Sequence, residues 1–402
     1  MSTARPRLLA CGAWDQGASY PRTRAMLAAL RAQGVAVAEC RVELPLGGQS
    51  KQRVAATPLA WPGLAVAMAG RRRAFLRAVR RAVAEHRPDA VLVPYPGHLV
   101  APWVRRAFAG PVVLDLFLSA YDTAVGDRAL LRPGSLPARV LRWLDRRAVA
   151  AADLVLLDTP EHARSIAELL DRPPRDFSWV PVSDPEAPAT PPVYQPPPSG
   201  GPVDLLFFGT GVPLHGLRHL LDAVALVPAV RLTLIGGTAA DRAHARTVLP
   251  PRRLRLGPEL VPRAELAAHL AACHLVAGVF GAGAKAQRVV PFKVVHGLAA
   301  GRPVLTAETA AICRWLQPGR DVVTCPAAEP AALRAALERL VARPDTLQAL
   351  AAAARPAYDA QFSEAAVGRR LLALLEPLTG VGDPRASGAA AVPVPAALGG
   401  SA

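Results

Sequence analysis

Lysine is almost absent from this chain, although basic residues are plentiful. Lys and Arg together number 47 in 402 residues, yet lysine occurs only at Lys51, Lys285 and Lys293. The formal charge of +16 favours an anionic partner of some kind without selecting one, because the arginines are spread over many expected helices. A lysine ammonium is a compact point charge that suits a phosphate oxygen. Two of the three lysines fall between residues 285 and 293, which marks this stretch; the alternative is a pair of solvated surface lysines.

Cysteine is also scarce, and its spacing excludes a zinc site or a disulfide framework. The count is odd and shows neither CxxC nor His-paired spacing, so the thiols are expected to be reduced and mostly buried, in a cytoplasmic protein. No apolar run is long enough to span a membrane. The run from Leu8 to Cys11 is cut short by Asp15 and Gln16, which argues against a signal peptide. The five cysteines are Cys11, Cys40, Cys273, Cys313 and Cys325.

Common ligand signatures are missing as well. GxxxxGK[ST] does not occur, and neither half begins with GxGxxG, so a P-loop and a standard dinucleotide site are excluded. Aromatic residues make up 5% of the chain and form no stacking or helix-turn-helix pattern, which argues against nucleic acid as a partner.

Short apolar runs alternate with helical patterns, and this alternation predicts parallel sheets covered on both faces. It stops in the Pro-rich stretch 183–202, which reads as an extended linker, and restarts at Val203. We therefore expect an α/β fold with two Rossmann-like domains facing each other across a cleft and a last helix, about 356–375, crossing back to the first domain. The expected parts are a domain over 1–182, a linker over 183–202, a domain over 203–355, a returning helix within 356–379 and a disordered tail over 380–402.

Three expected strand ends in the second half carry candidate ligand contacts, because parallel sheets bind ligands at the carboxyl ends of their strands. Gly209-Thr210-Gly211 closes the first strand and Gly236-Gly237 the next, although glycine after a strand is also a common turn device. The third end, within GVFGAGAKAQRVVPFKVVHGLAAGRPVL (278–305), leads into a helix start where cations add to the helix dipole. A diphosphate there would meet backbone donors and side-chain cations; the alternative is a solvated basic loop. The candidate contacts of this third end are Phe280, Gly281, Lys285, Arg288 and Lys293.

The stretch DLFLSAYDTAVGDR (115–128) places polar residues after a buried strand of the first half. Carboxylates there are costly unless they bind something, so Asp115 and Asp122, with Ser119, are candidates for acceptor contacts. Asp127 and Arg128 either take part or pair with each other. Asp158 or Thr159 is expected to cap a helix.

FFGTGVPLHG, LIGG and the 278–305 stretch, in this order, resemble the donor-binding half of glycosyltransferase family 4. PFKVVHGLAAGRPV is similar to that family's PxKxxExxAxGxPV pattern. The resemblance covers residues 203–345 best. It implies a GT-B fold and retaining transfer of a sugar from a nucleotide-diphosphate sugar to a hydroxyl acceptor (glycan, lipid or small molecule). It implies no cofactor and no metal, and no DxD-like cluster contradicts this.

The resemblance also assigns positions. Pro291 and Lys293 match the family's own Pro and Lys, whereas His296 stands where a glutamate usually meets the nucleotide ribose. Arg288 replaces the first glutamate of a conserved pair, near the donor sugar. Thr210 and His215 replace an Arg and a Lys that commonly bind the diphosphate. In the first half, Tyr20-Pro21-Arg22 resembles the family's early loop, which implies substrate contacts for Tyr20 and Arg22.

The substitutions leave two readings of the donor site open. Lys285, Arg288 and Lys293 neutralise the diphosphate, with Lys285, Arg288, Asp115 and Asp122 in the catalytic centre; or the chain is a catalytically silent GT-B protein that binds a sugar nucleotide or a partner. A nucleotide-sugar epimerase shares the architecture. A further candidate partner is an anionic membrane surface at the inner face of the membrane, because residues 71–86 form a basic amphipathic helix; the alternative is that its apolar side faces its own sheet.

Overall fold

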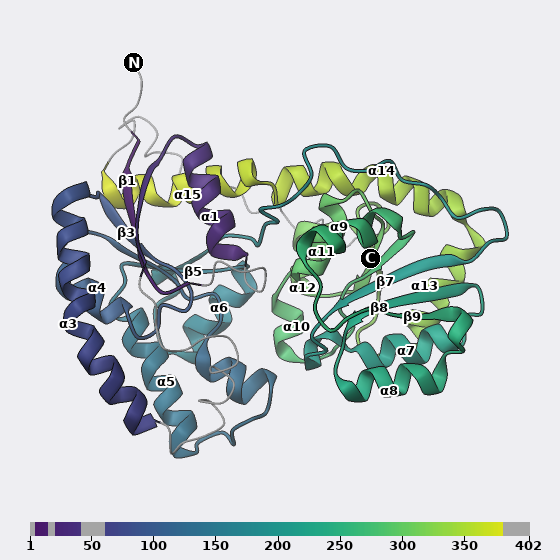
Figure 1. Ribbon diagram of the computed structural model, residues 1–402, viewed down its shortest axis with the longest axis horizontal. Helices are drawn as coiled ribbons and strands as arrows, with labels where there is room; N and C mark the ends of the chain where they lie inside the picture. The colour runs from purple at the N-terminus through teal and green to yellow at the C-terminus, as the bar shows by residue number, and fades with distance from the viewer. Residues whose placement is uncertain (1–4, 15–20, 42–60, 381–402) are drawn as a thin grey trace, which may run out of the picture.

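Two separate parallel sheets organise the chain, one in each half (Figure 1). The computed structural model describes residues 5–14, 21–41 and 61–380, with side chains from residue 71 onward in the third segment. Among the described residues each sheet has six strands, every pairing is parallel, and helices cover both faces, so the predicted α/β architecture of two Rossmann-like units is confirmed.

The N-terminal sheet has the order β2-β1-β3-β4-β5-β6. Its central strands are short runs of Val, Leu and Ala that are buried on both faces, as parallel strands require. The strands are β1 (Arg7–Gly12), β2 (Ala36–Arg41), β3 (Ala90–Val93), β4 (Val112–Asp115), β5 (Leu154–Leu157) and β6 (Phe177–Trp179). The helices of this half are α1 (Arg22–Ala32), α3 (Trp61–His86), α4 (Ala101–Ala107), α5 (Leu136–Val149) and α6 (Pro160–Leu169).

Alternate residues of β1 enter different cores, as the two-residue period of a strand dictates. Leu8 packs in a cluster with α1, whereas Leu9 packs in a cluster with Phe75 and Val79 of α3. The apolar side of residues 71–86 therefore faces its own sheet, which confirms the alternative to a membrane-facing helix. No described helix is both long and apolar enough to cross a membrane.

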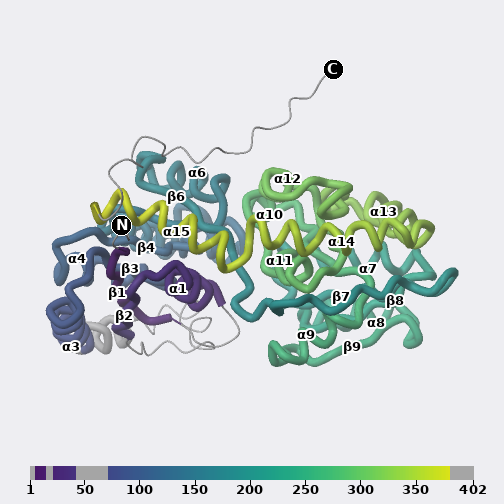
Figure 2. The backbone as a smooth tube through the Cα atoms, turned by 90° about the horizontal axis from the view of Figure 1, so that it is seen from above, coloured from purple at the N-terminus to yellow at the C-terminus, as the bar shows by residue number. Residues whose placement is uncertain are grey.

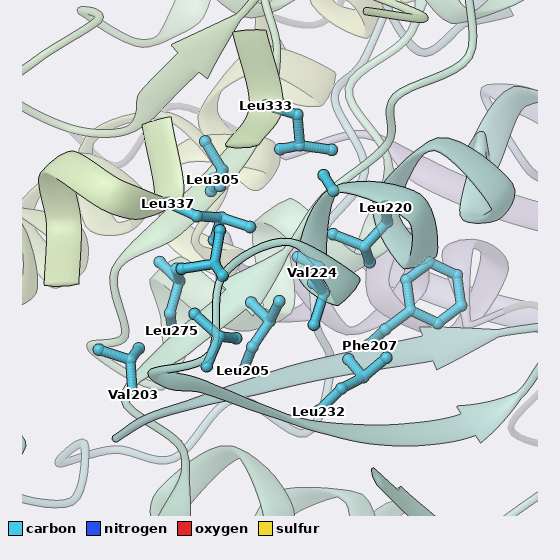
Figure 3. Packing of buried hydrophobic residues seen from close by; sticks show 14 of the residues in the cluster. Val203, Leu205, Phe207, Leu220, Val224, Leu232, Leu275, Leu305, Leu333 and Leu337 are labelled. Carbon is cyan, nitrogen blue, oxygen red and sulfur yellow. The ribbon is translucent and has the colours of Figure 1, made fainter. Parts of the chain in front are cut away.

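The C-terminal sheet has the order β12-β11-β10-β7-β8-β9. Its core is shown in Figure 3, where Phe207 and Leu205 of β7 meet Leu220 of α7 and Leu337 of α13. The strands are β7 (Val203–Gly209), β8 (Val230–Gly236), β9 (Leu254–Leu256), β10 (Leu275–Ala277), β11 (Val304–Ala307) and β12 (Val323–Cys325). The helices are α7 (Leu217–Ala225), α8 (Ala239–Val248), α9 (Arg263–Ala272), α10 (Ala284–Arg288), α11 (Phe292–Ala299), α12 (Ala310–Trp315) and α13 (Pro330–Ala342).

The chain returns to the N-terminal half through two helices rather than one (Figure 2). α14 (Pro344–Gln361) packs on α11, and α15 (Glu364–Thr379) packs on α1. The expected single helix over about 356–375 was wrong in this respect, because Ser363 starts a new helix. Its side chain accepts a hydrogen bond from the Ala366 N–H at 3.2 Å, as an N-cap does.

Gly368 makes the contact between α15 and α1 close. A Cβ atom at this position would lie 2.6 Å from the Ala29 carbonyl oxygen and 2.8 Å from Gln33 Cγ. Gly368→Val should therefore lower the free energy of unfolding by about 1–3 kcal/mol, the usual cost of overpacking. Ala365→Val, at an exposed position of the same helix, is the control. Urea unfolding followed by circular dichroism measures both, and equal midpoints would contradict the close packing.

Candidate functional site

The strand-end glycines of the C-terminal sheet pack backbone against backbone. Gly209 and Gly236 are aligned at the ends of β7 and β8, with φ of +139° and +82°. A Cβ at Gly236 would lie 2.2 Å from the Gly209 carbonyl oxygen, and the Gly237 N–H donates to that oxygen at 2.7 Å. No side chain fits at Gly236, and the positive φ of Gly209 and Gly237 also favours glycine, so the turn itself accounts for these three glycines.

Lys293 lies beside this turn, on the first turn of α11. Its side chain is 4% exposed, and its Nζ has no hydrogen-bond partner among the described residues. The Nζ lies 3.9 Å from the centroid of the Phe207 ring and would lie 3.3 Å from a Cβ at Gly209. Burial lowers the pKa of Lys293 well below its ordinary value. A buried amine without a partner is costly, so the position is prepared for an anion.

His215 lies against the other side of Gly209. A Cβ at Gly209 would lie 2.8 Å from His215 Cε1, and His215 Nδ1 is buried without a recorded partner. Burial, with a contribution from the charge of Lys293, lowers the pKa of His215 to about 2, so its ring is neutral near pH 7. Two unpartnered nitrogen-bearing side chains thus flank one glycine turn.

Glycines also fix the loop that carries His215. The Phe280 N–H donates to the His215 carbonyl at 3.0 Å, and the Gly281 N–H donates to the Leu214 carbonyl at 3.1 Å. A Cβ at Gly281 would lie 2.7 Å from the Pro213 carbonyl oxygen. The loops after β7 and β10 are therefore joined through their main chains.

Gly211 and Thr210 complete the turn after β7. A Cβ at Gly211 would lie 2.8 Å from the backbone nitrogen of Thr238, which begins the capping box of α8 with Asp241. Thr210 is exposed next to it. The predicted strand-end cluster is therefore assembled in one place, although its role in ligand binding stays a prediction.

The two cations of α10 contact the opposite half. Lys285 Nζ lies 3.1 Å from Asp127 Oδ2, and Arg288 Nη2 lies 3.1 and 3.2 Å from the two carboxylate oxygens of Asp122. Arg288 also donates to Ser165 of α6. We name the pairs Lys285–Asp127 and Arg288–Asp122 the interdomain clasp. Pairing with Arg128 was one of the two alternatives left open for Asp127, and the structure pairs Asp127 with Lys285 instead.

Both clasp carboxylates lie on one short element. Residues Asp122–Asp127 form a π-helical segment where the sequence suggested a loop. Nearby, Thr159 accepts from the His162 N–H at 3.1 Å, which confirms the expected helix cap. Its hydroxyl also donates to the Arg288 carbonyl, so the start of α6 belongs to the same interface.

Asp115 and Arg22 form a buried pair inside the N-terminal half. Arg22 Nε lies 2.9 and 3.1 Å from the two Asp115 oxygens, and its terminal nitrogens donate to the carbonyls of Leu157 and Val180 at 2.9 and 2.8 Å. Burial raises the pKa of Asp115, and the adjacent Arg22 counteracts it. This pair ties together the carboxyl ends of β4, β5 and β6.

Sequence reasoning missed two buried carboxylates that hold predicted site residues. Ser119 donates to Asp145 at 2.6 Å, and His296 Nδ1 lies 2.8 Å from Asp184 Oδ2. Burial would raise the pKa of Asp184, but His296 and Arg263 outweigh it and the pKa lies below its usual range. The Nδ1 atom of His296 therefore points at Asp184, in the Pro-rich stretch 183–202. The carboxylates of that stretch were the sequence signal from which this contact could have been suspected. Tyr20 lies outside the described residues.

Comparisons with known proteins agree with this architecture. The family model described as "Glycosyl transferase 4-like domain" matches residues 17–182, and "Glycosyl transferases group 1" matches residues 202–343. No curated protein sequence shows significant similarity to the chain.

Solved structures share the fold over nearly the whole chain. A sucrose-phosphate synthase from Thermosynechococcus elongatus has a TM-score of 0.70 at 16% identity, covering 94% of this chain and 100% of that one. Anabaena HepE in complex with UDP-glucose has a TM-score of 0.63 at 15% identity, covering 93% and 100%. WaaG, a glycosyltransferase involved in lipopolysaccharide biosynthesis, has a TM-score of 0.60 at 15% identity, again covering 93% and 100%.

The two parallel sheets and the returning helices define a protein of the GT-B fold class. The two family models together match well over half of the chain. The chain therefore belongs to the glycosyltransferases of the group 1 and group 4 type.

Arg22→Met should destabilise the protein by about 3–5 kcal/mol, because it leaves the Asp115 carboxylate buried without its partner. Arg24→Met is the matched control on the same helix: Arg24 pairs with Glu186, and both side chains are about one-third exposed or more. An exposed pair of this kind contributes about 0–1 kcal/mol. Urea unfolding measures both variants, and similar losses would show that the Arg22–Asp115 pair does not support the sheet ends.

Proposed function

We propose that this glycosyltransferase moves a sugar from a nucleotide-diphosphate sugar to a hydroxyl acceptor, with retention of anomeric configuration. The observation that carries the proposal is the buried Lys293 amine, which has no hydrogen-bond partner among the described residues and lies beside Gly209 and His215. The Anabaena HepE structures, which contain UDP and UDP-glucose, favour a nucleotide sugar as the donor here as well.

The pyrophosphate of the donor would lie against the turn after β7. There Lys293 and the N-terminus of α11 supply positive charge that is already in place when the glycosidic bond breaks. Negative charge on the leaving group increases in the transition state, so a fixed cation stabilises that state more than the ground state. The neutral His215 ring offers one N–H donor to a phosphate oxygen.

Proton uptake accompanies donor binding in this mechanism. Burial lowers the pKa of Lys293 in the empty site, whereas a bound diphosphate raises it by its opposite charge. Between these two pKa values Lys293 gains a proton on binding. Donor affinity is then greatest at low pH and weakens as the pH rises through the pKa of the empty site.

The members of the clasp can contact a substrate only if they give up their ion-pair partners. This applies to Lys285, Arg288 and Asp122. In the clasp the two cations already face carboxylates, so the phosphates or the donor sugar compete with Asp127 and Asp122 for them. The predicted catalytic roles of these residues and of Asp115 therefore include a step in which the interface rearranges. The acceptor contacts predicted for Ser119, Arg22 and Tyr20 would form only after that rearrangement.

Lys293→Met should lower sugar transfer about 10²–10³-fold, as removal of one preorganised transition-state contact does. The same change should raise the melting temperature by a few degrees, because it removes a buried amine without a partner. Activity is measured with a panel of nucleotide sugars, and NMR of the product's anomeric proton reports retention. Arg246→Met, at an exposed position on α8, is the control. Full activity in Lys293→Met overturns the proposal, and lost activity with a lowered melting temperature assigns Lys293 a structural role.

We infer that the membrane-facing surface is on α5 rather than within residues 71–86. Leu130, Leu136 and Trp143 are exposed by 62%, 74% and 55%, which is unusual for large apolar side chains. Leu130 precedes α5, whereas Leu136, Trp143 and the exposed Arg139 lie on it. The Arg147 guanidinium lies 5.2 Å from the Trp143 ring centroid. Apolar side chains mixed with arginines suit the headgroup region of an anionic bilayer.

Trp143→Ser should reduce binding to vesicles that contain phosphatidylglycerol by about tenfold, the order of the transfer free energy of one buried aromatic side chain. Leu226→Ser is the control, since Leu226 is equally exposed, by 55%, in the C-terminal half. Vesicle flotation measures the bound fraction. Binding that is the same with phosphatidylcholine alone, or that is lost equally in both variants, would exclude α5 as the contact.

A further inference from the structure

Two cysteines face each other on adjacent strands at the edge of the N-terminal sheet. Cys11 of β1 and Cys40 of β2 are aligned partners in the parallel register. Neighbouring strands lie about 4.8 Å apart, and aligned residues project to the same face. Disulfides join Cα atoms about 4.4–6.8 Å apart, so a bond between these residues requires little movement of the backbone.

The two thiols differ in access. Cys11 is fully buried in the core that contains Leu9 and Val91, whereas Cys40 is half-buried at its margin. β2 is the edge strand, so a small polar oxidant reaches Cys40 first. This arrangement provides one attacking thiol and one sheltered thiol that can resolve the product.

The thiols also differ in acidity. The hydrogen bond from Cys11 lowers the pKa of Cys40 to about 7, and the same contact together with burial raises the pKa of Cys11. Cys273 and Cys325 lack a cysteine partner, and burial raises the pKa of each to about 12. Cys313 is exposed, but partial burial and Glu308 raise its pKa too. Cys40 is the cysteine that combines access, acidity and a neighbouring thiol.

We propose that Cys40 and Cys11 form a reversible disulfide when the protein meets hydrogen peroxide. The Cys40 thiolate attacks one peroxide oxygen, the O–O bond breaks, and with one proton taken up the products are a Cys40 sulfenic acid and water. The Cys11 thiol then attacks the Cys40 sulfur, the S–O bond breaks, and its proton leaves with the hydroxyl as a second water. A dithiol supplies the two electrons for reversal by thiol–disulfide exchange.

The bond would cross-link the edge strand to the strand beside it. Among the described strands only β1 pairs with β2, so the disulfide would make this edge resistant to opening. The site lies on the N-terminal sheet and uses none of the residues proposed for the donor. The disulfide proposal is therefore independent of the proposal of sugar transfer.

Intact mass spectrometry of the whole protein tests the proposal without any variant. One equivalent of peroxide at pH 7 should remove two hydrogens, and a non-reducing tryptic digest should contain the peptides of Cys11 and Cys40 joined together. Dithiothreitol should reverse both changes. Added oxygen without a cross-linked peptide, or a cross-link that involves Cys313, overturns the proposal.

Two variants separate the roles of the thiols. Cys11→Ala should leave a Cys40 sulfenic acid that dimedone traps, and this acid should form more slowly than in the unchanged protein because the hydrogen bond that lowers the pKa of Cys40 is gone. Cys313→Ser should behave as the unchanged protein. At pH 7 Cys40 should react about tenfold faster than Cys313, because the pKa of Cys40 is lowered to about 7 whereas that of Cys313 is raised, so a larger fraction of Cys40 is thiolate. Equal reactivity of the two cysteines, read by peptide mapping, overturns the assigned order of attack.

Discussion

A lysine amine buried without a partner is the constraint on which the rest of the C-terminal half depends. No described carboxylate forms a hydrogen bond with Lys293. Its amine instead contacts the face of the Phe207 ring and a glycine turn. The glycines of that turn leave backbone within reach of the amine, and α11 holds its stem in the core. Such a position costs stability in the empty protein and is favourable only when negative charge arrives. The sheet, the turns and the helix around it can be understood as the scaffold that maintains this unfavourable placement.

Contacts between the two halves combine ion pairs with buried apolar packing. The clasp and the Arg314–Glu161 pair cross the interface, as do the aromatic contacts of Phe117 with Phe292 and of Trp179 with Trp315, at 6.3 and 4.8 Å between ring centroids. Phe117 and Val182 are buried in the same cluster as residues of the C-terminal half. The ion pairs can exchange their carboxylate partners for phosphate oxygens, whereas the apolar contacts have to slide or separate when the halves move apart. The permanent connection is covalent and helical, through residues 183–202 and through α14 and α15.

Much of the fold could be predicted because buried parallel strands are short continuous apolar runs, and each was followed by a helical pattern. Some elements lack such a pattern: Ala239–Val248 (α8) is rich in Ala and Arg, and Leu254–Leu256 (β9) is too short to show a period. The glycine turns and Lys293 could be located from the strand-end rule. The clasp could not, because Lys285 and Asp127 are 158 residues apart and only the packing of the two halves brings them together. The same holds for Asp184 and His296, which are 112 residues apart.

The position of α15 has a consequence for how the protein is made. Val367, Leu371 and Leu375 complete the cluster that contains Leu8, Met26 and Leu30, so the first domain to leave the ribosome lacks part of its own core until α15 has been synthesised. Until then one face of its sheet, along β1 and β3, exposes leucines to solvent. A gene fragment that ends before α14 would produce this incomplete domain, and its exposed apolar face would promote aggregation. Adding α15 as a separate peptide would cover that face and reduce the aggregation.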